Sequence, residues 1–327
     1  MGRIALLELH LANVLLSSAL LFSRWIDAPV PFVIASRCVV AAAALWIFLR
    51  LSASRSPMGW EGKQSKLPSA ERMQSERLVL EGIQPGSLPL AGLSKRATGS
   101  KEMIFLALSG VLLGGHWIVF FYAGRISSIA LAVVTMHTYP LMTSLIEPWL
   151  EGSVDFRKYR TDVLLALVAF LGIAYMGSAT LQRDGLFLGL MAAVLITARN
   201  LVVRRRLSAV SGARSMLWQI VSAGILLSPA LFYYPYRGYW PQTSDLVLIL
   251  TLGLLITAVA HTLLTRAVVK MSARTTGIIA SVQPLYSAVA AYFFFDEIPS
   301  SAVFLGGGLV LGSAMLESYR YSKRTAE

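Results

Sequence analysis

The sequence predicts an all-α integral membrane protein in which ten transmembrane helices form two inverted five-helix repeats. Composition is the first observation: 56% of the residues are hydrophobic, 14% are charged, and the mean hydropathy is +0.64. A soluble domain usually has about 25% charged residues, so the composition indicates a chain that lies in lipid. The second observation is a series of long apolar runs, and the third is a pattern that recurs 144 residues later.

A helix needs roughly 20 mostly apolar residues to cross the hydrocarbon of a membrane, and ten runs of the sequence meet this requirement. They lie near residues 4–26, 30–50, 102–122, 128–149, 161–180, 185–204, 215–234, 245–268, 274–295 and 301–319.

The basic residues predict how these spans are oriented. With a cytoplasmic N-terminus, 24 Lys and Arg residues fall on the cytoplasmic side and 4 on the other, while Arg37 lies inside a span. Cytoplasmic loops carry such an excess, so we expect a multi-pass inner-membrane protein with both termini in the cytoplasm. The net charge of +12 is then explained by these loops and their contact with anionic lipid, and no nucleic-acid partner is expected.

The third observation, the internal repeat, relates residues 116–151 to residues 260–299. Each copy has an apolar span, a short basic turn and a second span with a central proline, Pro140 or Pro284. Identical residues 144 positions apart are Leu108 and Leu252, Ala123 and Ala267, Ser128 and Ser272, Pro140 and Pro284, and Leu141 and Leu285. Because five helices are an odd number, the second half must enter the membrane from the opposite side, which makes the repeat inverted.

These features divide the chain into successive regions. Residues 1–160 hold helices 1 to 4 of the first repeat and a polar cytoplasmic loop at 51–101, and residues 161–180 form helix 5. Residues 181–319 form the second repeat, and 320–327 a cytoplasmic tail. Within the loop, residues 69–83 are interpreted either as an amphipathic surface helix or as a disordered linker.

Polar side chains inside apolar spans are the candidates for function, because they are costly in lipid and usually face the protein interior. We expect a substrate path lined by Asn13, Ser17, His116, Trp117, Phe120, His137, Tyr139, His261 and Gln283. Aromatic rings would shape the path, and the histidines and Gln283 would supply hydrogen bonds or carry protons. The alternative for each polar group is an ordinary interhelical hydrogen bond.

Other residues receive different interpretations. Pro140 and Pro284 are expected to act as hinges beside the path, with a packed kink as the alternative. Arg37 is interpreted as an architectural partner of a carbonyl or an ion rather than as a substrate ligand. Glu147 is a titratable candidate that falls near the cytoplasmic interface.

No motif in the sequence predicts an enzyme, a cofactor or a metal site. The chain has no HExxH, GxSxG or P-loop motif, and its one cysteine, Cys38, lies in an apolar run. The only carboxylate pair suited to interfacial chemistry is Asp296 with Glu297, which is more typical of a solvated helix end.

The run TRAVVKMSARTTGIIASVQPLYSAVAAYFFFDEIPS at 265–300 resembles the second repeat of EamA-type transporters of the drug/metabolite transporter superfamily, with Pro284 followed thirteen residues later by Glu297. The span pattern from 4 to 319 is similar to the ten-helix layout of that family. Three features depart from it. Leu16 and Ser17 stand where the family commonly has Trp-Gly, and Ser153 stands thirteen residues after Pro140, where an acidic residue is expected. The third is the long loop at 51–101.

The resemblance implies a secondary carrier, commonly an exporter of amino acids or related small metabolites. We therefore expect alternating-access export of a small polar metabolite, with protons as a candidate coupling ion and a monomer or homodimer as the assembly. Uptake or exchange, for example of a nucleotide-like compound, remains the alternative. Two hypotheses come from other functional classes. One is a membrane enzyme that acts on lipid, and the other is a receptor or scaffold that uses the 51–101 loop.

Overall fold

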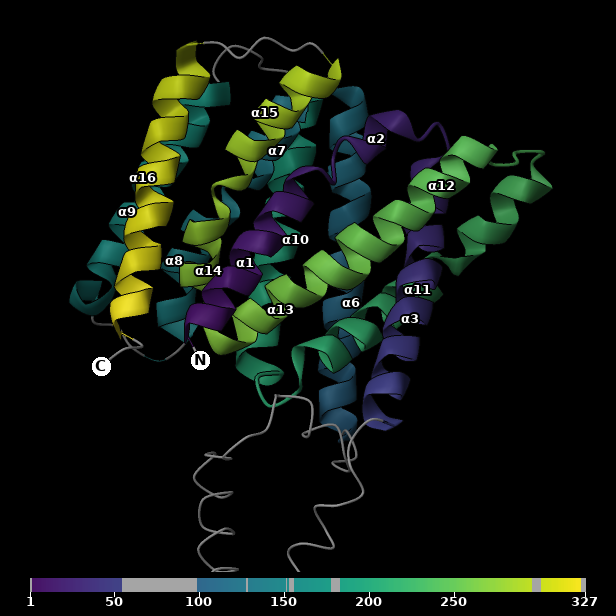
Figure 1. The fold of residues 1–327 in the computed structure, drawn as a ribbon, viewed down its shortest axis with the longest axis horizontal. Coiled ribbons are helices and arrows are strands. Elements are labelled where there is room, and N and C mark those ends of the chain that lie inside the picture. The colour runs from purple at the N-terminus through teal and green to yellow at the C-terminus, as the bar shows by residue number, and fades with distance from the viewer. Residues whose placement is uncertain are drawn as a thin grey trace, which may run out of the picture.

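The computed structural model describes residues 2–54, 99–127, 129–150, 152, 156–177, 183–295 and 301–324. Within these ranges every regular element is a helix (Figure 1). The segment 69–83 and the carboxylate pair at 296 and 297 lie outside the described residues, so their predictions are not tested.

The helices of the first half are α1 (Gly2–Ser17), α2 (Phe22–Trp25), α3 (Val30–Ser54), α6 (Ser100–Ile126), α7 (Ile129–Met136), α8 (Tyr139–Leu150) and α9 (Phe156–Gly177). Those of the second half are α10 (Arg183–Arg206), α11 (Gly212–Tyr236), α12 (Thr243–Thr251), the π-helical η2 (Leu252–Ala260), α13 (His261–Lys270), α14 (Ala273–Ala280), α15 (Gln283–Phe295) and α16 (Ser301–Arg324).

The chain is a multi-pass membrane protein. Seven helical segments within the described residues are long and apolar enough to cross a membrane: 4–25, 30–52, 100–126, 183–206, 212–236, 243–270 and 273–294. The other three expected spans coincide with α7 and α8, with α9 and with α16. Large apolar side chains such as Leu7, Phe232 and Leu305 point outward, as lipid-facing residues do.

Two expected spans, 128–149 and 274–295, are each divided into two helices just before the central proline. The first span breaks between α7 and α8, and the second breaks between α14 and α15. Pro140 and Pro284 are each the second residue of the helix that follows the break. Proline is tolerated there because the backbone N–H groups of a first helical turn have no intrahelical partner. The span at 4–26 is likewise divided, into α1 and α2.

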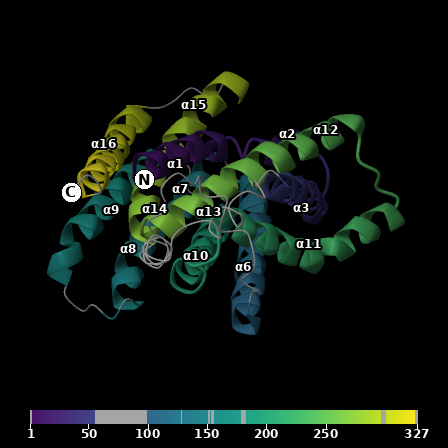
Figure 2. The same ribbon diagram turned by 60° about the horizontal axis from the view of Figure 1, so that its bottom comes forward.

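The two broken spans pack crosswise at the centre of the bundle. Helix α8 packs against α14, and α7 packs against α15. In Figure 2, α9 and α16 lie on one flank of the bundle and α3, α11 and α12 on the opposite flank. Close packing between α6 and α11 depends on Gly110, because a Cβ atom there would lie 2.5 Å from the Gln219 carbonyl oxygen.

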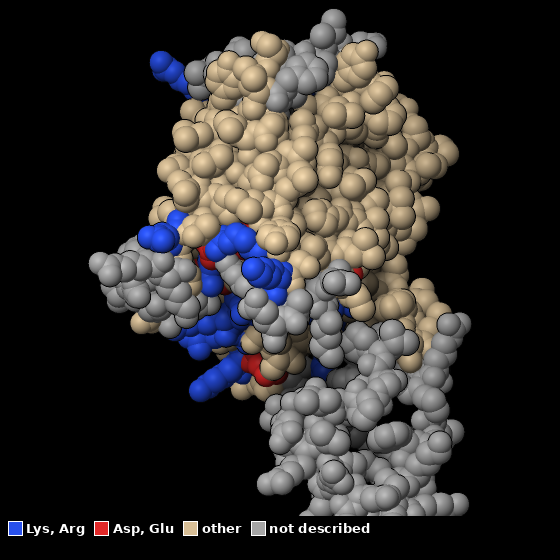
Figure 3. Space-filling view, turned by 60° about the vertical axis from the view of Figure 1, so that its left-hand side comes forward, with Lys and Arg blue, Asp and Glu red and all other residues tan. Residues whose placement is uncertain are grey.

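Charged side chains are concentrated at one end of the molecule. Both termini lie at this end (Figure 1), and Figure 3 shows Lys and Arg gathered there beneath a surface of other residues. We call it the basic end.

Candidate functional site

A cavity of about 50 Å³ lies where the two halves meet. Its described lining residues are Leu16, Ser17, Ala19, Leu20, Arg37, His116, Trp117, Phe120, Phe121, Val133, Met136, His137, Tyr139, Ile196, Asn200, His261, Leu264, Gln283 and Ser287. A buried water needs about 10–15 Å³ on this measure, so the cavity holds roughly three or four waters. A metabolite would therefore require the walls to move apart.

Most of the sequence-predicted site residues lie on this cavity. Its lining includes Ser17, His116, Trp117, Phe120, His137, Tyr139, His261 and Gln283. Asn13 does not line it but accepts a hydrogen bond from Gln283. Pro140 and Pro284 each follow a lining residue directly in the sequence.

The substrate path expected from the sequence leaves out other lining residues, notably Arg37, Phe121, Asn200 and Ser287. Arg37 had a visible signal, a formal charge within an apolar span, but was interpreted as architectural. Phe121 had no such signal, because a phenylalanine in a membrane span is ordinary.

Three helix breaks border the cavity. Ser17 ends α1, His137 lies between α7 and α8, and Gln283 begins α15. In a membrane, backbone that leaves helical geometry is tolerated only where it is buried in protein or lines a polar space. The positions of the breaks thus mark this cavity as the place where the bundle interior departs from regular helix packing.

Polar side chains join α1 to α15 beside the cavity. The Gln283 amide nitrogen donates to the Asn13 Oδ1 at 2.9 Å, and the Ser287 hydroxyl donates to the Ser17 carbonyl oxygen at 2.7 Å. Asn13 also donates to the carbonyl oxygen of Ile279 at 3.3 Å. These bonds connect the first helix of one half to the broken span of the other.

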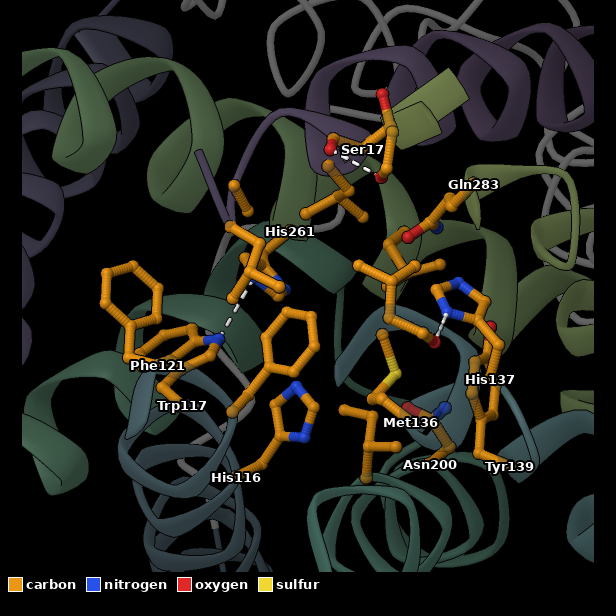
Figure 4. Close-up of a pocket in the computed structure, with 18 of the residues that line it drawn as sticks. Ser17, His116, Trp117, Phe121, Met136, His137, Tyr139, Asn200, His261 and Gln283 are labelled. Atoms are coloured by element: carbon orange, nitrogen blue, oxygen red, sulfur yellow. Dashed lines mark hydrogen bonds between the residues drawn. The ribbon is translucent and has the colours of Figure 1, made fainter. Parts of the chain in front are cut away.

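Trp117 and His261 fix one wall of the cavity (Figure 4). The indole Nε1–H donates to the His261 Nε2 at 3.1 Å, and the two residues are 144 positions apart. Because an indole can only donate, Nε2 must accept, so the proton of this neutral imidazole resides on Nδ1. His261 Nδ1 is buried and has no hydrogen-bond partner, so it is an unused donor at the cavity.

The other two cavity histidines bond to backbone. His116 Nδ1 is 2.9 Å from the Ala192 carbonyl oxygen, and His137 Nδ1 is 2.8 Å from that of Val133. A carbonyl only accepts, so each Nδ1 carries a proton. His137 Nε2 is left buried without a partner, and Figure 4 shows His137 beside Gln283 and Tyr139, across from Trp117.

Arg37 enters the cavity wall from α3 and is 1% exposed. Its Cζ lies 3.8 Å from the centre of the Trp117 ring and 5.3 Å from that of Phe121. Stacking occupies the face of the guanidinium, whereas its N–H groups point outward in the plane. The Nε and Nη2 atoms are buried with no hydrogen-bond partner.

The second buried arginine, Arg199, has a different environment. Its guanidinium donates to Gln219 Oε1 at 2.8 Å, to Asn200 Oδ1 at 3.0 Å and to Thr265 Oγ1 at 2.6 Å. Arg199 is therefore held by hydrogen bonds to protein side chains, whereas Nε and Nη2 of Arg37 have no such bond.

A separate group of ion pairs lies at the basic end. We call Glu8, Glu147, Asp162, Arg266, Lys270, Arg274 and Arg320 the basic-end cluster. Glu8 pairs with Arg266 at 2.6 Å and with Lys270 at 3.5 Å, and Asp162 pairs with Arg274 and with Arg320 at 3.0 Å each. Each of these pairs joins a residue before position 181 to one after it.

Glu147 belongs to this cluster and not to the cavity. Its two oxygens accept from the backbone N–H groups of Ala273 at 2.9 Å and Arg274 at 2.8 Å, the first residues of α14. A carboxylate at a helix N-terminus satisfies unpaired donors and interacts favourably with the helix dipole. One side chain of α8 thereby caps a helix of the other half.

The described residues contain no group of three or more His, Cys, Asp or Glu that could hold a metal ion. The arrangement offers instead a small interior cavity with unused donors and acceptors.

The chain is similar to known proteins in part of its sequence and in its fold. A family model described as the EamA-like transporter family matches residues 183–319. A solved crystal structure, described only as that of a protein, is similar in fold with a TM-score of 0.68 and 16% sequence identity over 98% of this chain and 99% of that chain. At this identity the likeness concerns the fold alone. No curated protein is significantly similar to the chain.

Proposed function

Because a model of the EamA-like transporter family matches its second half, we propose that the chain is a secondary carrier that exports a small polar metabolite by alternating access. An amino acid or a related compound is the expected class of substrate. The central cavity carries this proposal: polar side chains and three helix breaks meet inside a bundle whose outside is apolar.

The proposed architecture is ten transmembrane helices in two inverted repeats, divided near residue 181. In its support, both broken spans break at equivalent positions: α7 and α14 end 144 residues apart, as α8 and α15 begin 144 residues apart. Crosswise packing of α7 with α15 and of α8 with α14 is what a two-fold relation between the halves requires. The Trp117–His261 hydrogen bond also joins equivalent positions.

Alternating access requires the halves to separate at one end of the bundle at a time. The basic-end cluster supports this mechanism, because its ion pairs and the Glu147 cap hold the two halves together at the basic end. Breaking them would open the cavity to that side. Pro140 and Pro284 are the proposed hinges, since each stands beside a break that separates two helices.

The proposed orientation places the basic end in the cytoplasm of an inner-membrane protein, in agreement with the excess of Lys and Arg there. Protons are the proposed coupling ion, because three histidines line the cavity.

Counterflow into proteoliposomes tests the proposed function. Vesicles that contain the purified protein and an excess of unlabelled compound are mixed with the same compound in radiolabelled form, across a panel of amino acids and nucleosides. We expect transient accumulation of label for at least one amino acid, and none in protein-free vesicles. Accumulation of a nucleoside alone would favour the exchange alternative, and accumulation of no compound would contradict a carrier of either class.

A further inference from the structure

We infer that Arg37 and His261 form a subsite for a carboxylate group of the transported substrate. This inference rests on the proposed function and defines one chemical group of its substrate. It also revises the structural role that the sequence suggested for Arg37.

The charge of the cavity is the first step. Arg37 is the one Asp, Glu, Lys or Arg among the described residues of the lining. A buried charge normally requires a partner, because loss of hydration is costly in a low-dielectric interior. Arg199 satisfies this requirement with neutral side chains, but Nε and Nη2 of Arg37 have no partner. The missing partner is therefore expected to be an anion that enters the cavity.

The geometry of the donors is the second step. Trp117 contacts both groups: its ring lies 3.8 Å from the Arg37 Cζ, and its Nε1 lies 3.1 Å from the His261 Nε2. The same contacts leave the edge of the guanidinium and the Nδ1–H of His261 unused. Two donors held against one indole suit the two oxygens of a carboxylate, which guanidinium binds readily in plane.

The backbone adds positive potential to the cavity. Tyr139 and Gln283 are the first residues of α8 and α15, helices of 12 and 13 residues, and both line the cavity. A helix N-terminus carries a partial positive charge, and N-termini of broken helices recur at anionic groups in secondary transporters. The two helix N-termini and Arg37 therefore all favour a negatively charged group in the cavity.

The amount of charge selects between oxyanions. One arginine neutralises a carboxylate, whereas a phosphate monoester carries close to two negative charges at neutral pH. The second negative charge of the phosphate would have no partner inside the bundle, and an unpaired buried charge is energetically costly. A carboxylate is thus favoured over a phosphate.

The test is a binding measurement that does not depend on transport. The thermal unfolding of the purified chain in detergent is monitored by tryptophan fluorescence. Each sample contains one added compound: L-leucine, L-threonine, L-phenylalanine, the amide of one of these, sodium propionate or inorganic phosphate. We expect at least one carboxylate to raise the melting temperature and its amide to require about tenfold or more higher concentration for the same shift. This comparison needs only the wild-type protein.

Variants then assign the effect to Arg37. Arg37→Gln should remove the difference between acid and amide, and Arg37→Lys, which keeps the charge without the planar fork, should retain part of it. Arg199→Gln is the matched control: it should lower the melting temperature, because Arg199 bonds three side chains, but keep the difference between acid and amide.

Several outcomes would overturn the subsite. These are equal stabilisation by acid and amide, preferential stabilisation by phosphate, an unchanged preference in Arg37→Gln, and no stabilisation by any carboxylate. If a neutral nucleoside shows counterflow while carboxylates do not bind, the subsite is wrong and a carrier function stands. If carboxylates bind through Arg37 but no compound shows counterflow, the subsite stands and the carrier function is wrong.

Discussion

At the scale of single residues, Glu147 connects the two halves most directly. It contacts the N-terminus of α14 through two backbone hydrogen bonds and lies 3.5 Å from Arg274 Nη1. Its side chain is 3% exposed, so solvent screens these contacts little. A carboxylate in this position holds α8 against the start of α14 only while it is ionised and in place.

Glu147→Gln is expected to favour opening at the basic end. The amide keeps one acceptor oxygen but replaces the second with a donor that faces a backbone N–H group, and the attraction to Arg274 is lost. Loss of a hydrogen bond to a charged group costs about 1.5–3 kcal/mol, which shifts the equilibrium between closed and open forms by roughly tenfold or more. The measurement is the rate at which Met136→Cys, on the cavity wall, reacts with an impermeant thiol reagent applied to inside-out vesicles.

The control for this experiment is Glu102→Gln, the same exchange in the first turn of α6 and outside the basic-end cluster. It should leave the labelling rate at the level of Met136→Cys alone. Equal rates for the two glutamine variants would mean that Glu147 does not restrain opening.

Residue types predicted much of the cavity lining, because polar groups inside membrane spans have few favourable places except the interior. Contacts between residues far apart in the sequence could not be predicted in the same way. The sequence does not reveal that Arg37 stacks on Trp117, eighty positions away, or that Glu147 reaches the start of α14. Such contacts depend on how helices cross, which side-chain patterns alone do not specify.

At the scale of elements, the broken spans could be predicted only in part. The prolines indicated where each span is weak, and the breaks fall just before them, between α7 and α8 and between α14 and α15. A proline suits the first turn of a new helix, because a backbone N–H there has no intrahelical partner. Whether a span bends or divides depends on tertiary packing, and packing was not available from the sequence. The π-helical geometry of η2 had no sequence signal either.

Pro284→Ala tests whether the break in the second repeat matters for transport. Alanine would restore a backbone N–H that can bond to the Ala280 carbonyl oxygen, and it would favour a continuous helix from α14 into α15. We expect slower counterflow, because a continuous helix across positions 281 and 282 would remove the proposed hinge. Pro229→Ala, inside α11 and away from the cavity, serves as the matched exchange. Equal transport in the two variants would exclude a hinge at Pro284.

At the scale of the whole molecule, the ion pairs between the halves and the basic side chains lie at the same end. The ion pairs that join the halves lie at the end where the termini lie (Figure 1) and where Figure 3 shows Lys and Arg side chains gathered. Composition predicted a membrane bundle and charge predicted an orientation, but neither indicated that ion pairs would join the two halves at the basic end. These pairs form because α1, α8 and α9 bring carboxylates to basic residues of α13, α14 and α16.

Thiol labelling can test the proposed orientation with little background, because Cys38 is the only cysteine and is buried. Arg237→Cys lies between α11 and α12, and Lys323→Cys lies near the end of α16, at the basic end. If the halves are inverted and the basic end is cytoplasmic, an impermeant maleimide added to intact spheroplasts should label position 237 and not position 323. Inside-out vesicles should give the reverse pattern. The ten-helix arrangement has three spans between the two positions, so they must lie on opposite sides of the membrane. Labelling of both positions from the same side would contradict that arrangement.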